Sequence, residues 1–105
     1  MNELKNIVTE KAFLKQVIEL AVTLGWKVEH VFEQAKYARR TSKGFPDLVL
    51  ARVMDTIPES EVIFAELKSE KGQPTSAQIE WGHATDAFLW RPSDWPEIER
   101  VLGGE

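Results

Sequence analysis

The chain has 105 residues, of which 43% are hydrophobic and 29% charged, and its size suits one domain over residues 1–105. The formal net charge of -4 argues against binding nucleic acid by bulk positive charge, and the absence of cysteine excludes disulfide scaffolds and thiolate metal sites. No apolar run is long enough to span a membrane and residues 1–5 lack a secretory pattern, so we expect a cytoplasmic protein with no membrane partner.

The first predicted element is an amphipathic helix from near residue 9, or somewhat earlier, to residue 24, with Gly25 as its stop. Its apolar residues recur at helical spacing: Phe13 or Leu14, Val17, Ile18, Ala21 and Leu24. Glu10 lies one turn before this stripe and on nearly the same face. It is either a first-turn acid favoured by the helix dipole after a Thr9 cap, or an acidic ligand that points toward the sheet.

A strand with one buried face follows, because its apolar residues alternate with charged ones: Trp26, Val28, His30 and Phe32. His30 is most simply a core histidine, and a catalytic or phosphate contact is the alternative. Residues 34–44 are polar and predict an extended loop. This region is locally basic, which fits either a solvated surface or a stripe that holds DNA phosphates, through Lys36, Arg39, Arg40, Lys43 and Arg52.

Residues 47–53 and 62–68 are rich in β-branched and apolar side chains and predict a hairpin. If Val53 meets Val62 beside the loop, Asp47 lies opposite Lys68 and one diagonal step from Glu66. All three side chains then share one face of the sheet, and a register shift of two residues would preserve this. The structural alternative to a functional site is a ladder of ion pairs at the end of the hairpin.

A second helix is predicted to begin after Gly72-Gln73-Pro74, where Thr75 and Gln78 have the spacing of a capping box. The capping box accounts for Gln78 without any function, although its amide would also lie at the helix end nearest Lys68. A last strand is predicted over residues 87–90. A short helix capped by Ser93 then turns its apolar residues inward and stops at Gly103: Trp95, Ile98, Val101 and Leu102.

These segments, in this order, closely resemble the stand-alone VRR-NUC domain proteins of phages and bacteria, which belong to the PD-(D/E)xK nuclease superfamily. The matching motifs extend over nearly the whole chain: Thr9-Glu10, Gly25-Trp26, His30, Gly44-Phe45-Pro46-Asp47-Leu48, Phe64-Ala65-Glu66-Leu67-Lys68, Gly72, Gln78, Trp81 and Trp90-Arg91-Pro92-Ser93-Asp94-Trp95. The resemblance implies an α/β (α+β) nuclease core. Its order would be helix-strand-strand-strand-helix-strand around a mixed four-stranded sheet, with a short C-terminal helix here. The stretch between Trp81 and Trp90 is shorter than in such relatives.

The resemblance also implies roles for particular residues. Asp47, Glu66 and the backbone carbonyl of Leu67 would bind a metal ion, and Lys68 would orient or deprotonate the attacking water. Two further positions match the family's outer residues: Glu10, acting through a water, and Gln78. Because every candidate ligand is an oxygen, the ion should be Mg²⁺ or Mn²⁺.

The activity implied by the resemblance is a metal-dependent endonuclease that acts as a homodimer on branched DNA such as four-way (Holliday) junctions. A two-fold dimer would present two sites to a junction of approximate two-fold symmetry. Two alternatives stand beside it. One is a DNA-binding or assembly subunit that keeps the fold without cleaving, and the other is a nuclease that acts on linear duplex or flap DNA.

Overall fold

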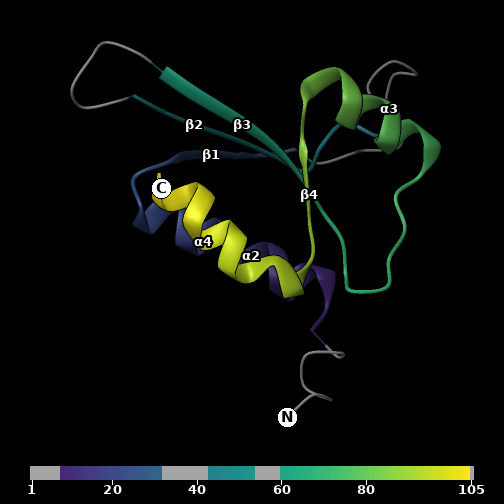
Figure 1. The fold of residues 1–105 in the computed structure, drawn as a ribbon, viewed down its shortest axis with the longest axis horizontal. Coiled ribbons are helices and arrows are strands. Elements are labelled where there is room, and N and C mark those ends of the chain that lie inside the picture. The colour runs from purple at the N-terminus through teal and green to yellow at the C-terminus, as the bar shows by residue number, and fades with distance from the viewer. Residues whose placement is uncertain (1–7, 32–42, 54–59, 105) are drawn as a thin grey trace.

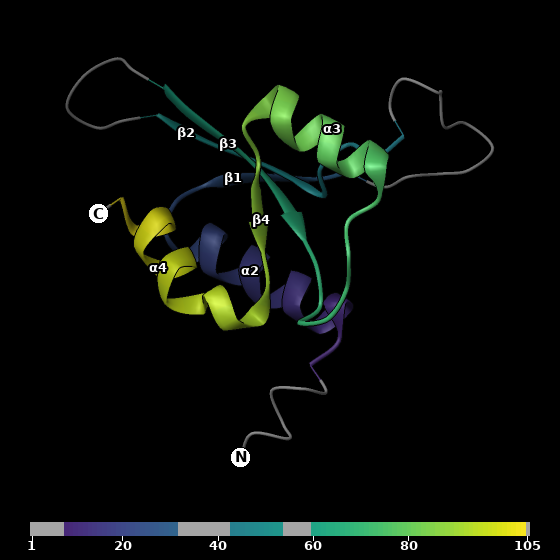
Figure 2. The same ribbon diagram turned by 45° about the vertical axis from the view of Figure 1, so that its right-hand side comes forward.

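The computed structural model of the chain describes residues 8–31, 43–53 and 60–104. These residues form three α-helices, a short 3-10 helix and four strands in one mixed sheet (Figure 1). Helices α2 and α4 cover one face of the sheet, and α3 lies against the other (Figures 1 and 2). The predicted order of elements, the mixed four-stranded sheet and the additional C-terminal helix are confirmed.

Helix α2 (Glu10–Thr23) begins where the sequence predicts, because the Thr9 hydroxyl accepts a hydrogen bond of 3.0 Å from the backbone N–H of Ala12. Gly25 follows the helix with a φ of +94°, a conformation that glycine adopts without strain. Leu24, which the periodicity predicts to face inward, is 39% exposed, since it lies beyond the last helical turn. The residues buried against the sheet are Phe13, Val17 and Ala21.

The sheet has the strand order β1-β2-β3-β4. Strand β1 (Lys27–His30) pairs antiparallel with β2 (Leu48–Val53), and β2 pairs antiparallel with β3 (Ser60–Leu67). The edge strand β4 (Phe88–Trp90) runs parallel to β3. The two middle strands therefore carry the Asp47 and Glu66 segments side by side.

The hairpin register differs by two residues from the predicted one, because Val53 pairs with Ser60 and not with Val62. Strand β3 begins earlier than expected, which brings Glu61 directly opposite Arg52. The two side chains form an ion pair of 3.2 Å, and such cross-strand charge pairs favour one register over another. Since the shift is even, each side chain keeps its predicted face of the sheet.

The core lies between the sheet and helices α2 and α4. Its sheet side consists of alternate residues of β2 and β3, and its helix side comes from α2 and α4. The Trp26 indole N–H donates a 2.9 Å hydrogen bond to the carbonyl of Leu102, and the Arg52 guanidinium lies 4.2 Å from the Trp26 ring. These contacts join the C-terminal helix to the β1 and β2 edge of the sheet.

Helix α3 (Ser76–Thr85) has the predicted capping box. The Gln78 N–H donates to the Thr75 hydroxyl at 3.1 Å, and the Thr75 N–H donates to Oε1 of Gln78 at 2.8 Å. Asp86 ends the helix in the left-handed conformation, with a φ of 56°. The chain then enters β4 almost at once, which accounts for the short stretch between Trp81 and Trp90.

The predicted cap at Ser93 is wrong. A 3-10 helix, η2 (Pro92–Asp94), precedes helix α4 (Trp95–Gly103), and the Ser93 N–H donates to Oε2 of Glu70 at 2.6 Å. Asp94 stabilises this turn instead, because its carboxylate accepts a 2.9 Å hydrogen bond from the Arg91 N–H. Helix α4 continues through Gly103 and ends at Gly104, and it buries Ile98 and Leu102. Among the described residues, no helix combines the length and apolarity needed to cross a membrane.

Candidate functional site

Asp47 lies immediately before β2 and is held from both neighbouring strands. Its carbonyl accepts a 2.9 Å hydrogen bond from the Val31 N–H, and its carboxylate Oδ2 accepts one of 2.9 Å from the Leu67 N–H. The last β2–β3 pair is Leu48 with Ala65, so the register extended by one residue sets Asp47 opposite Glu66. The prediction that Asp47 lies opposite Lys68 is therefore wrong, for the same reason that the hairpin register is shifted by two residues.

Glu66 is the buried charged group of this site. It lies on β3 with 6% exposure, and among the described residues neither of its carboxylate oxygens has a hydrogen-bond partner. The Lys68 ammonium lies 3.5 Å from Oε2 of Glu66 and is itself largely buried. A buried carboxylate without hydrogen bonds is costly when it is ionised, and a single cation at this distance offsets only part of that cost.

The electrostatic balance at Glu66 works against its charged form. The pKa of Glu66 is raised from its ordinary 4.5 to about 7, first by burial and then by the neighbouring Asp47 carboxylate. Lys68 acts in the opposite direction and does not reverse it. In an ion-pair ladder the lysine would dominate and the pKa would fall. The Lys68 ammonium alone therefore does not make the ionised form of Glu66 the favoured one at neutral pH.

The donors at this site fit a hard divalent cation. Asp47 and Glu66 supply carboxylate oxygens, and the hydrogen bond from Leu67 to Asp47 brings the Leu67 peptide beside them. No group of three His, Cys, Asp or Glu side chains that could hold a metal occurs in the described part of the chain. Mg²⁺ needs no such group, since it is commonly bound by one or two carboxylates together with waters and substrate phosphates.

Glu10 does not join the two carboxylates directly. It is exposed in the first turn of α2, as expected of an acid favoured by the helix dipole. Val8 and Glu70 line the same groove, so the start of α2 lies at the end of the sheet where β3 finishes. Since α2 covers the sheet face opposite Glu66, the contact of Glu10 with the site through water remains a prediction.

Gln78 and Glu66 both line a cleft between α3 and β4. Its Oε1 is used by the capping box, so its Nε2 amide is the group that can donate to a phosphate.

The predicted DNA contacts have mixed outcomes. His30 pairs with Leu48, whose side chain is in the core facing α2, so His30 lies on the opposite face of the sheet from Glu66. It lines a hollow beside α2. Lys43 is exposed just before Gly44, and its predicted contact with DNA remains a prediction. The remaining cations of the basic loop lie outside the described residues: Lys36, Arg39 and Arg40.

The residues before Asp47 fix helix α3 beside the site. Gly44 has a φ of +87°, and a Cβ there would lie 2.6 Å from the backbone carbon of Ala77. The Phe45 ring packs edge-on against Trp81 of α3 and Phe64 of β3, with centroid distances of 4.8 and 6.0 Å. The Gly-Phe-Pro segment therefore joins Asp47, β3 and the start of α3 into one packed unit.

Arg91 is a site residue that the sequence analysis missed. Its Nη1 donates to the carbonyls of Ser69, Glu70 and Gly72, at 2.8, 3.2 and 2.6 Å. These carbonyls belong to the turn directly after Lys68, and an added Cβ on Gly72 would lie 3.6 Å from the Lys68 side chain. Arg91 thus holds closed the turn that packs along Lys68. Its place in the Trp90-Arg91-Pro92 motif was the available signal.

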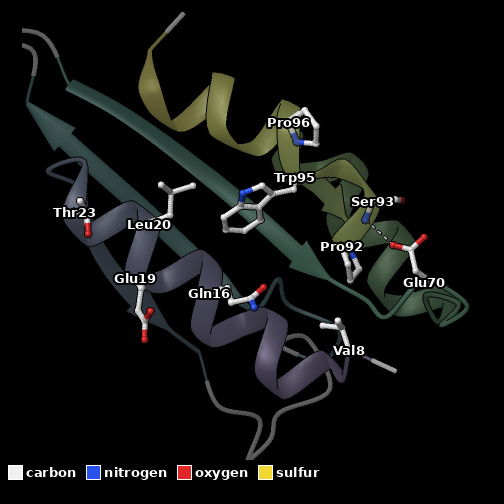
Figure 3. A pocket seen from close by; sticks show the side chains of 10 residues that line it. All are labelled: Val8, Gln16, Glu19, Leu20, Thr23, Glu70, Pro92, Ser93, Trp95 and Pro96. Atoms are coloured by element: carbon white, nitrogen blue, oxygen red, sulfur yellow. Dashed lines mark hydrogen bonds between the residues drawn. The ribbon is translucent and has the colours of Figure 1, made fainter. Parts of the chain in front are cut away.

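A groove larger than the cleft between α3 and β4 lies elsewhere among the described residues. It has a volume of about 1030 Å³ and runs between α2 and the η2–α4 segment, on the core side of the sheet. Figure 3 shows Trp95 between α2 and α4, with the bond from Ser93 to Glu70 at one end. None of the predicted site residues lines this groove. The predicted site residues Glu66 and Gln78 line the smaller cleft, where Glu66 is a buried carboxylate without a hydrogen-bond partner among the described residues.

Comparison of the chain with models of known protein families, with curated proteins and with solved structures gives no match.

Proposed function

We propose that this protein is a divalent-metal-dependent endodeoxyribonuclease. The observation that carries the proposal is the meeting of the Asp47 and Glu66 carboxylates beside Lys68, with Glu66 buried and its pKa raised to about 7. Hydrolysis of a phosphodiester requires a nucleophile at neutral pH and neutralisation of charge on the phosphate. Two carboxylates that can hold a cation, with a lysine next to them, supply the groups for both requirements.

Each residue has a distinct part in this proposal. Asp47, Glu66 and the Leu67 carbonyl would hold Mg²⁺ or Mn²⁺, which when bound would neutralise charge on the phosphate and lower the pKa of water. The Leu67 N–H keeps the Asp47 carboxylate turned toward the site. The Lys68 ammonium donates to a phosphate oxygen and stabilises the negative charge that develops there. Gln78 Nε2 adds a donor from α3, and Glu10 contributes through water.

The proposed substrate is branched DNA such as a four-way junction, cut by a homodimer. This part of the proposal is supported by the resemblance to stand-alone VRR-NUC proteins. It is also supported by the match between a two-fold dimer and the approximate two-fold symmetry of a junction. Lys43, together with Lys36, Arg39 and Arg40, would bind the phosphate backbone of the arms, whereas Arg52 is engaged by Glu61 and Trp26 on the core side of the sheet.

The test is a cleavage assay with labelled four-way junction, flap and linear duplex in Mg²⁺ or Mn²⁺, with EDTA as the metal-free control. We expect cleavage of the junction, lost in EDTA and reduced about 10²-fold or more in Asp47→Asn and Lys68→Met. The amide that replaces the carboxylate in Asp47→Asn keeps an oxygen that can accept from the Leu67 N–H, so the effect of this variant isolates the charge. Glu99→Gln, an exposed acid on α4, is the matched control and should cleave like the wild type.

Two results would redirect the proposal. Tight DNA binding without cleavage of any substrate would identify a DNA-binding or assembly subunit instead of an enzyme. Equal cleavage of linear duplex and junction would keep the nuclease but reject its preference for branched DNA.

A further inference from the structure

A cleft opens between α3 and the edge strand β4, on the side of Glu66 away from β2. Its volume is about 370 Å³, within the range of small-molecule sites. Figure 2 shows α3 above the β3 and β4 side of the sheet, and the chain passing from the end of α3 into β4. Because Glu66 lines the cleft, the cleft is continuous with the proposed metal site.

The cleft has apolar walls that are left uncovered. Ile79 of α3 and Leu89 of β4 line it, and they are 47% and 41% exposed. Gly82 also lines it, and an added Cβ there would meet no atom of the described residues within 4 Å. Glycine inside a helix costs about 1 kcal/mol relative to alanine. The wall of the cleft is therefore open at Gly82, where the helix has a residue of low helix propensity.

The charged groups of the cleft narrow the chemistry of a ligand. The Glu66 side chain is only 7% exposed, and its oxygens have no hydrogen-bond partner among the described residues. Asp86 is a second, exposed carboxylate on the lining. His83 also lines the cleft, but the two carboxylates there disfavour a phosphate, whereas a carboxylate accepts hydrogen bonds from the amino groups of nucleobases. Apolar walls in turn suit the flat face of a base.

We propose that this cleft holds the nucleoside attached to the scissile phosphate, with its base against Ile79 and Leu89 and an amino group toward Asp86. The inference rests on the proposed nuclease function and specifies the form of DNA on which it acts. A base inside a duplex is stacked on both sides and enters a pocket only after it is extruded, at a cost of a few kcal/mol. Junctions with unpaired positions, flaps and single strands offer such a base at a lower cost. The cleft therefore selects DNA with an unpaired nucleotide beside the cut.

The first test fills the cleft from the helix side with Gly82→Leu. Gly103→Leu is the matched control, because Gly103 ends α4 on the other face of the sheet and its added Cβ would also meet no described atom within 4 Å. The probe is an oligonucleotide with one unpaired 2-aminopurine, and its fluorescence is measured in Ca²⁺. We expect Gly82→Leu to bind this probe about tenfold more weakly than the wild type, and Gly103→Leu to bind it equally well.

A second pair of variants removes the apolar wall without filling the space. Ile79→Asn is compared with Val22→Asn, since Val22 is a 58% exposed apolar residue on α2, away from the cleft. Ile79→Asn should weaken binding of the unpaired probe severalfold, and Val22→Asn should not. Circular dichroism and thermal unfolding establish that each variant is folded. If Gly82→Leu does not fold, this second pair decides the question.

The outcomes separate the cleft from the nuclease proposal. Equal affinity of the wild type and the cleft variants for the unpaired probe would overturn the nucleoside site, as would equal affinity of the wild type for the probe and for a fully paired duplex. Binding that depends on the cleft, in a protein that cuts no DNA in Mg²⁺ or Mn²⁺, would reject the nuclease and retain the nucleoside site.

Discussion

Glu66 is the residue whose surroundings most constrain the chemistry of the candidate site. Burial and the Asp47 carboxylate both oppose its ionisation, and the Lys68 ammonium at 3.5 Å does not overcome them. Without a bound cation the carboxyl therefore holds its proton up to about neutral pH. A divalent cation would displace that proton, so proton release and cation binding are coupled at this residue.

The raised pKa of Glu66 makes folding stability depend on pH in a defined window. The unfolded carboxyl ionises near 4.5 and the folded one near 7, so the stabilisation is complete below 4.5 and is lost as the pH rises through 7. In EDTA at pH 8, we expect Glu66→Gln to be more stable than the wild type by about 1–3 kcal/mol. The difference should nearly vanish at pH 4.5. Urea unfolding of both proteins across this range measures it.

The Glu99→Gln variant is the control for this measurement, because it makes the same substitution at an exposed position on α4. A Glu66→Gln protein that is less stable than the wild type at pH 8 would contradict the prediction. It would mean that the ionised Glu66 and Lys68 pair stabilises the fold, as the ladder interpretation requires.

At the scale of elements, the position of α3 depends on the segment before β2. Gly44 approaches the backbone of Ala77 so closely that no Cβ fits, and Phe45 contacts α3 and β3 together. The helix that carries Gln78 and the cleft is therefore fixed to the same segment that presents Asp47. A change in this segment should disturb both sides of the site at once.

Gly44→Ala tests this packing. We expect it to destabilise the protein by about 2–4 kcal/mol, since the strain of a positive φ adds to a steric clash with Ala77. Gly25→Ala separates the two effects, because Gly25 has a φ of +94° but an added Cβ there would have no described atom within 4 Å. It should cost about 1 kcal/mol. Equal losses in urea unfolding would show that the close approach to α3 does not matter.

At the scale of the whole molecule, the site lies where separate parts of the fold meet. The turn after Lys68 is held by Arg91, which follows the last strand, and Ser93 binds Glu70 of the same turn. A cation bound by Asp47 and Glu66 would add to contacts that already join the middle strands to the C-terminal segment. Binding should therefore stabilise the fold as a unit.

We expect Mn²⁺ to raise the midpoint of thermal unfolding of the wild type at pH 8, and EDTA to reverse the rise. Saturation at 100 times the dissociation constant contributes about 2.7 kcal/mol. For a domain of this size that corresponds to a shift of about 10–20 °C. The shift should be absent in Asp47→Asn and retained in Glu99→Gln, as measured by differential scanning fluorimetry. An equal shift in both variants would show that Mn²⁺ binds elsewhere.

Local patterns predict those parts of this protein that depend on local physics. The Thr9 cap, the stripe of α2 and the Thr75 capping box follow from spacings of a few residues, and strand alternation predicts that Asp47 and Glu66 share a face. The exact partner of Asp47 depends on where β3 begins, which the Arg52 and Glu61 pair helps to set. Alternation does not encode that choice.

Local sequence patterns do not predict the contacts between distant segments. Arg91 binds carbonyls about 20 positions earlier in the chain, and nothing in the spacing of charges distinguishes it from a surface arginine. Ser93 is a residue type that often caps helices, but it lies inside a 3-10 turn. In that turn the Asp94 carboxylate accepts the hydrogen bond from the Arg91 N–H. The open space at Gly82 depends on how α3 crosses β4, which becomes visible only in three dimensions.

The two-residue alternation of side chains in the β2–β3 hairpin has a consequence for how relatives of this protein can diverge. Side chains return to the same face after every second residue, so the hairpin can slide, lengthen or shorten in even steps while both carboxylates keep their face. A single inserted residue between a carboxylate and the rest of its strand would instead turn that carboxylate into the core. Length variation far from the site should therefore be tolerated freely, whereas odd changes within the paired strands should be eliminated by selection.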